Sequence, residues 1–136
     1  MKGIVYLSYY GAINNTDTSG KRLFSVSNVT YTNKPIEHLE GLKPGDLTWK
    51  YKNGEISWND FMRQYVLNIS NGQGRNDMEF IKQLVNNGEN PVLICCEKEP
   101  PCHRFILGEL LCMEGYEVMQ LLKDSEIPYI AVSCFT

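Results

Sequence analysis

The fold is decided by the stretch Pro91-Val-Leu-Ile-Cys-Cys96, which is followed by the loop Glu97 to Pro101 and by the triplet Cys102-His-Arg104. A continuous apolar run of this length is typical of a strand that is covered on both faces. We therefore expect it to lie centrally in a parallel sheet. The residues from about Cys102 to Glu114 then predict a helix that Gly115 ends, which completes a strand–helix unit.

Further elements alternate along the chain around this unit. The capping box Ser57 to Asp60 predicts a helix whose buried face carries Trp58, Phe61 and Tyr65. A second helix is expected from Asn76 or Asp77 to Gly88, and strands are expected from Ile4 to Tyr10, Tyr116 to Leu121 and Ile127 to Phe135. The alternation predicts an α/β fold, namely a single-domain three-layer sandwich with a mainly parallel central sheet over residues 1–136.

Two segments lack a clear periodic pattern. Gly11 to Gly20 is rich in turn-forming residues and predicts a surface loop after the first strand. Between Leu23 and Tyr51, prolines and glycines interrupt a weak alternation, so we expect irregular structure there. We consider a lid across the functional site as the role of this second segment.

Composition argues against several classes of protein. The 136 residues carry a net charge of −3, which argues against nonspecific binding to duplex nucleic acid. The first apolar run, Ile4 to Leu7, is too short for a signal peptide or a membrane span. The five cysteines include the adjacent pair Cys95 and Cys96, a pattern unlike a secreted disulfide framework. We therefore expect reduced thiols, no membrane partner and a cytoplasmic location.

The loop after the central strand predicts the functional site, because ligands of parallel sheets gather at the carboxyl ends of the strands. Cys102, His103 and Arg104 fall in the first turn of the following helix, where unpaired amides favour an anion. We expect Glu97 and His103 to serve in acid–base chemistry, and we consider Cys102 as a reactive thiol.

Ligand binding is assigned to a partly different set of residues. Arg104 is the principal candidate, because a guanidinium binds an anion through two parallel hydrogen bonds. Cys95, at the end of the central strand, is a second candidate, and Ser8 and Tyr9, which end the first strand, could face the same crevice.

Spacing tests other kinds of site at these residues. Cys96 and Cys102 stand eight and two positions before Arg104, and neither spacing matches the loop of a cysteine phosphatase. Cys95, Cys102 and His103 could hold zinc, but no CxxC or HxxxH pair supplies a standard site and no fourth ligand is apparent. We therefore expect no metal and no cofactor. A Cys102–His103 nucleophile pair is disfavoured because neighbouring residues on a helix diverge.

A purely structural role is the alternative for each of these side chains. Cys96, Cys112 and Cys134 are expected to pack as small apolar groups, and for Cys102 a packed thiol and an activated thiol stay equally open. His38 has polar neighbours and is expected at the surface. Glu97, His103 and Arg104 could also pin the loop to the helix without any ligand.

The strand and the triplet resemble the signature of domain-of-unknown-function family 488, an apolar strand that ends in Cys-x-Glu and is followed by Cys-His-Arg and a helix. The resemblance places that signature on Cys95, Glu97 and the triplet Cys102-His-Arg104, with Cys96 at the variable position. It extends more loosely to Leu7 through Ala12 and to Tyr51 through Tyr65, whereas Phe105 departs from the polar or basic side chain of many relatives. The family has no settled activity, so the resemblance implies an α/β fold and a shared motif.

These observations lead to three functional hypotheses. The first is a small enzyme that acts on a phosphate-bearing or nucleotide-like ligand at the amino-terminal end of the Cys102 helix. The second is a non-catalytic module that sequesters a nucleotide or binds a protein partner. The third is a structural cluster without a ligand, in which Arg104 contributes only to stability. The sequence does not define the oligomeric state.

Overall fold

One mixed sheet organises the chain in the computed structural model, which describes residues 1–98, 101–123 and 125–128. Within these residues the strand order is β3-β2-β4-β1-β5-β6. The strands are β1 (Val5–Tyr9), β2 (Arg22–Ser25), β3 (Glu37–His38), β4 (Pro91–Cys95), β5 (Val118–Leu122) and β6 (Ser125–Pro128). The helices are α1 (Tyr10–Ile13), η1 (Glu40–Leu42, a 3-10 helix), α2 (Asp46–Lys52), α3 (Trp58–Ile69), α4 (Gly72–Asn86) and α5 (His103–Met113).

Strand β4 lies at the centre of the sheet, as its apolar sequence predicted. It pairs in parallel with β1 on one side and with β2 on the other, and all five of its residues are buried. Only β6, at one edge, runs antiparallel to its neighbour β5. The predicted α/β fold with a mainly parallel central sheet is therefore confirmed.

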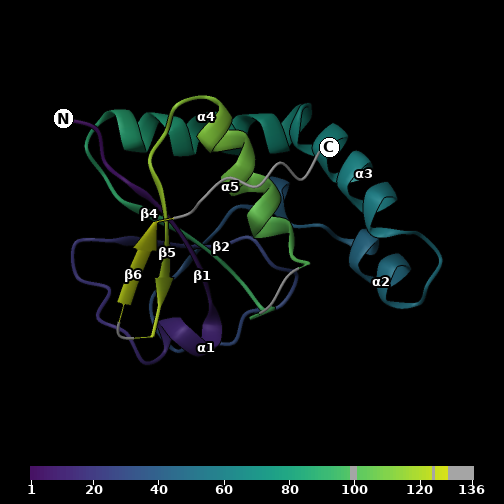
Figure 1. Cartoon of the computed structure of the whole chain (residues 1–136), viewed down its shortest axis with the longest axis horizontal. Helices are drawn as coiled ribbons and strands as arrows, with labels where there is room; N and C mark the ends of the chain where they lie inside the picture. The colour runs from purple at the N-terminus through teal and green to yellow at the C-terminus, as the bar shows by residue number, and fades with distance from the viewer. Residues whose placement is uncertain (99–100, 124, 129–136) are drawn as a thin grey trace.

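The two faces of the sheet are covered unequally. Helices α3, α4 and α5 lie along one face, and the short α1 lies on the other (Figure 1). Side chains alternate between the faces, so Leu7, Leu93 and Cys95 join the larger core under α3–α5, whereas Tyr6 and Ile94 join the smaller core with α1. Because Cys95 faces the large helical layer, it points toward the beginning of α5.

Helix α3 begins where the capping box predicted. The Ser57 hydroxyl accepts a hydrogen bond from the Asp60 amide, and the Asp60 carboxylate accepts one from the Ser57 amide. Phe61 and Tyr65 are buried, and Trp58 packs against the same core while partly exposed. Helix α4 begins at Gly72, about one turn before the predicted start, because Asn71 rather than Asp77 precedes the first helical residue.

The segment from Leu23 to Tyr51 is more regular than its sequence predicted. It contains most of β2, all of β3 and η1, and most of α2. A close approach fixes η1 against α4: a Cβ atom on Gly41 would lie 2.4 Å from the amide nitrogen of Gly74. The expectation of irregular structure holds for residues 26–36, which form no helix or strand. It was wrong for the rest of the segment, because the short strands and helices there are stabilised by packing rather than by their own periodicity.

Three smaller predictions also meet the structure. Tyr10 to Ile13 form α1, so part of the expected surface loop from Gly11 to Gly20 is buried helix. The last strand spans Ser125–Pro128, and the remainder of the predicted strand Ile127 to Phe135 lies outside the described residues. No helix in the described part of the chain has the length and apolar character needed to cross a membrane.

Candidate functional site

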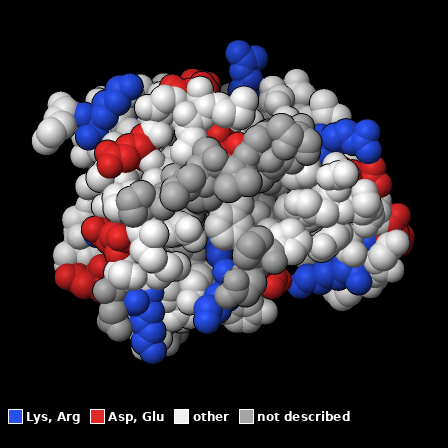
Figure 2. All heavy atoms as spheres, viewed as in Figure 1, with Lys and Arg blue, Asp and Glu red and all other residues white. Residues whose placement is uncertain are grey.

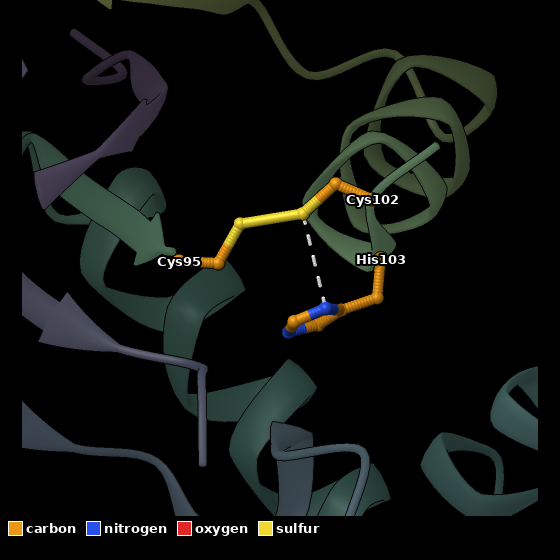
Figure 3. Close-up of side chains that lie close together, drawn as sticks. All are labelled: Cys95, Cys102 and His103. Atoms are coloured by element: carbon orange, nitrogen blue, oxygen red, sulfur yellow. Dashed lines mark hydrogen bonds between the residues drawn. A yellow bond between two sulfur atoms is a disulfide. The ribbon is translucent and has the colours of Figure 1, made fainter. Parts of the chain in front are cut away.

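Cys95, Cys102 and His103 converge at the carboxyl end of β4. Cys95 is the last residue of the strand, Cys102 precedes the first turn of α5, and His103 is the first residue of that helix (Figure 3). All three side chains are buried, and one potential donor atom from each lies within 4.8 Å of the others. The topology therefore brings together two sulfur atoms and an imidazole from positions that the loop separates in sequence.

Cys102 and His103 face each other, which corrects the expectation that they diverge. The Cys102 Sγ atom lies 3.9 Å from His103 Nδ1. Cys102 has φ −150° and ψ 142°, so its backbone is extended and it stands just outside the helix. The divergence of adjacent residues on a helical surface does not apply to a residue at the N-cap. A base partner for Cys102 is thus present on the next residue.

One hydrogen bond fixes the state of His103. Its Nε2–H donates to the backbone carbonyl of Val26, at 2.6 Å, so Nδ1 carries the lone pair that faces Cys102. The ring also packs edge to face against Tyr65, with ring centres 5.3 Å apart. The pKa of His103 is lowered from 6.5 to about 4, chiefly by burial and to a smaller extent by the nearby Arg104 charge, whereas the Val26 carbonyl and Glu97 act in the opposite direction. The imidazole is therefore neutral at pH 7.

Arg104 connects the strand, the loop and the helix. Its guanidinium donates to the Glu97 carbonyl, to the Lys98 carbonyl at 2.8 Å and to Cys95 Sγ at 3.0 Å. The side chain is 2 % exposed, and its guanidinium lies over the rings of Phe105 and Tyr9. These contacts favour the interpretation that Arg104 pins the loop to α5. Its assignment as a ligand-binding residue stays a prediction.

Two adjoining pockets reach the Cys102–His103 pair. One, of about 370 Å³, is lined by both residues and by Cys95; the other, of about 450 Å³, is lined by Cys102 and His103. Both are also bounded by Thr48 and Lys52 of α2. The segment that we considered as a lid therefore contributes part of the pocket walls, and its role as a lid stays a prediction. Further lining residues of the first pocket are Ser27, Asn28, Val29, Tyr31, Pro44 and Trp49.

The other predicted site residues lie at different distances from this centre. Glu97 lines both pockets, and its half-exposed carboxylate forms an ion pair with Lys52 at 3.3 Å. Tyr9 contacts Arg104 and does not line either pocket. Ser8 faces the opposite side of the sheet, where its hydroxyl donates to the Leu121 carbonyl at 2.6 Å. The structure thus places Glu97 at the pockets that Cys102 and His103 line, and it places Ser8 on the other side of the sheet.

Sequence reasoning missed the residues that α2 and the loop after β2 contribute. Val26, Tyr31, Trp49 and Lys52 lie in or beside the segment that was expected to be irregular. One signal was available, since Trp49 and Tyr31 are large aromatic residues in a stretch without a buried periodic face. Both are exposed at the pocket, at 67 % and 61 %.

The cysteines differ from expectation at two places. The structure joins Cys95 and Cys102 in a disulfide, contrary to the expectation of reduced thiols throughout. Cys96 is exposed rather than packed, because β4 ends one residue before it. Cys112 is half-buried and packs against the core, as expected, and Cys134 lies outside the described residues. His38 is exposed, as predicted.

Comparison with known proteins supports the resemblance found in the sequence. The family model DUF488-N3a, described as the active DUF488-N3 subclade, matches residues 37–115, which is more than half of the chain. The match includes Cys95, Glu97 and the Cys102-His-Arg104 triplet. No curated protein and no solved structure matches the chain.

Replacing Arg104 with lysine tests its structural role. A lysine keeps the charge but cannot reach both loop carbonyls and the sulfur with one planar group. Buried acceptors that lose their donor are costly, so we expect R104K to lower the free energy of unfolding by about 3 kcal/mol in urea denaturation. R63K, at an exposed position of α3, is the control and is expected to change little. Equal stability of the two variants would show that Arg104 does not pin the loop.

The depressed pKa of His103 predicts a specific dependence of stability on pH. Below pH 6.5 the unfolded chain protonates this residue, whereas the folded chain resists protonation down to about pH 4. The free energy of unfolding of the wild type therefore falls as the pH is lowered through this window. H103Q keeps a donor for Val26 and does not titrate, so from pH 7.5 to pH 5 it is expected to lose about 2 kcal/mol less than the wild type.

H38Q is the matched control, because His38 is the other histidine and is exposed. Urea denaturation at several pH values measures all three proteins. If the free energy of unfolding of H103Q falls with decreasing pH as steeply as that of the wild type, the result contradicts a neutral, buried His103.

Proposed function

The chain belongs to the DUF488 family, and from the geometry of its site we propose that it is a small enzyme acting on a phosphate-bearing or nucleotide-like ligand. The observation that carries this proposal is the position of Cys102 and His103, which line two adjoining pockets. A reactive pair at the carboxyl edge of a parallel sheet is the usual place for a ligand site in such folds.

The lining of the first pocket favours a planar ligand that carries negative charge. Trp49 and Tyr31 offer exposed aromatic surface on which a base can stack. Lys52 lies beside them in an ion pair with Glu97, and a phosphate would replace that carboxylate as the partner of Lys52. Asn28 and Thr48 supply polar side chains. A nucleoside monophosphate or diphosphate combines the two features that these residues recognise.

The chemistry is assigned to Cys102, His103 and Glu97. A neutral imidazole with its lone pair directed at the Cys102 sulfur is arranged to accept the thiol proton, which makes the thiolate available as a nucleophile. Glu97, at the rim of both pockets, is the second proton-transfer group. This chemistry requires the Cys95–Cys102 disulfide to be reduced, so we propose the cytoplasm as the location of the active protein.

Surface charge supports a small ligand rather than a long nucleic acid. On the face shown in Figure 2, lysine and arginine are interspersed with aspartate and glutamate and do not form a continuous basic stripe. Neutralising many phosphates along a duplex requires such a stripe. We therefore propose neither a duplex nucleic acid nor a membrane as the partner.

A nucleotide panel tests the proposal. Reduced protein is titrated with nucleosides, nucleoside monophosphates, nucleoside diphosphates and inorganic phosphate, and binding is followed by calorimetry while products are followed by chromatography. We expect a nucleotide to bind and be converted. W49A is expected to weaken its binding by about 5- to 150-fold, because stacking on an aromatic ring contributes about 1–3 kcal/mol. L67A removes an exposed apolar side chain outside the pocket and serves as the control.

Three outcomes distinguish the hypotheses. Turnover that C102A abolishes while binding persists supports the enzyme. Stoichiometric retention of a nucleotide without turnover identifies a sequestering module instead. Failure of every member of the panel to bind contradicts the proposed ligand class, whatever the behaviour of the variants.

A further inference from the structure

We propose that, in the reduced protein, Cys95, Cys102 and His103 bind one zinc ion and leave its fourth position open to the pockets. The three residues are the group of buried sulfur and nitrogen donors that the described residues bring within 4.8 Å of one another. Catalytic zinc sites use three protein ligands, and two cysteines with one histidine are among the known sets. The absence of a fourth protein ligand argued against zinc in the sequence analysis. A zinc site with an open position needs only three protein ligands.

The imidazole is oriented as a metal ligand requires. A histidine that binds metal usually donates its other ring N–H to a carbonyl or carboxylate, which fixes the tautomer. His103 does so through Nε2–H to Val26, and its Nδ1 lone pair lies 3.9 Å from Cys102 Sγ. A tetrahedral zinc ion with ordinary Zn–S and Zn–N bond lengths separates such atoms by about 3.6 Å. The Cys102 sulfur and the His103 nitrogen are thus close to the required separation, and the two sulfurs move apart when the disulfide is reduced.

The backbone separation of the two cysteines also suits a shared ion. Their Cα atoms lie 7.9 Å apart. Cysteines joined in disulfides usually have Cα atoms about 4.4–6.8 Å apart. Two thiolates that bind opposite sides of one ion are not held to that limit. Reduction of the pair therefore leaves sulfur atoms that face a common point from β4 and from the beginning of α5.

Charge balance favours a divalent ion at this buried position. Two thiolates and one neutral imidazole carry a charge of about −2, of which the buried Arg104 guanidinium offsets about one, so a divalent cation neutralises the negative charge that is left on the ligands. The Arg104 guanidinium donates to Cys95 Sγ, a hydrogen bond that stabilises the thiolate and orients it. Soft thiolate and imidazole ligands select zinc over magnesium or calcium, which prefer oxygen.

The open position would face substrate. Cys95, Cys102 and His103 line the pocket that carries Trp49 and Tyr31, and Glu97 stands at its rim. A ligand or water molecule in the pocket would therefore complete the coordination. In this zinc-bound state the Cys102 sulfur and the His103 Nδ1 lone pair are ligands, so the thiol chemistry proposed above belongs to the reduced, metal-free protein. The metal site does not depend on which ligand the pocket takes, so it can be tested without substrate.

The test uses the full chain, reduced with a phosphine and stripped of metal with a chelator. Zinc is added, unbound metal is removed by gel filtration, and bound metal is measured by mass spectrometry. We expect about one zinc per chain and no retained magnesium. Cobalt is expected to replace zinc and to give the absorption of a thiolate–cobalt complex. C95S, C102S and H103Q are each expected to lower zinc affinity at least tenfold.

C96S and C112S are the matched controls, because Cys96 and Cys112 lie outside the cluster. Both variants are expected to bind zinc as the wild type does. Circular dichroism checks that each variant is folded, and alkylation of the wild type gives a readout without any variant: zinc should protect Cys95 and Cys102 but not Cys96. The proposal is overturned if the reduced wild type retains less than about a tenth of an equivalent of zinc. It is also overturned if the C95S/C102S double variant binds zinc as the wild type does.

Discussion

The hydrogen bond from His103 Nε2–H to the Val26 carbonyl is the constraint on which the site depends. It joins the first residue of α5 to the chain that leaves β2, and it directs Nδ1 at the sulfur of Cys102. The ring is buried and packs against Tyr65, and this burial keeps the imidazole neutral. The hydrogen bond to Val26 selects the tautomer and fixes the ring at the wall of the pocket.

Arg104 provides the second constraint. It holds the carbonyls of Glu97 and Lys98 and contacts the Cys95 sulfur, so the loop after β4 is attached to the helix that follows it. The guanidinium thereby sets how Cys95 approaches Cys102. A residue that the sequence suggested as an anion ligand is built into the support of the site. Both the thiol chemistry and the metal site that we propose use this support.

Local signals predicted the main fold. The unbroken apolar run of β4 requires burial on both faces, and the Ser57–Asp60 box satisfies amides that any helix beginning there leaves unpaired. The sequence also located Cys95, Cys102 and His103 at one loop. It did not predict that Cys102 and His103 converge, because this depends on the extended backbone of Cys102. Nor did it predict Trp49 and Lys52 at the pocket, since η1 and α2 are placed by tertiary contacts such as that between Gly41 and Gly74.

The most direct test of the account is the protonation state of His103 in the metal-free protein with the Cys95–Cys102 disulfide formed. Long-range nitrogen–proton NMR correlation distinguishes the two neutral tautomers and the imidazolium. At pH 5.5 the account predicts a neutral His103 with the proton on Nε2 and a lone pair on Nδ1, because its pKa is lowered to about 4. An imidazolium at that pH, or a proton on Nδ1, would contradict the geometry on which both the catalytic pair and the zinc site are based.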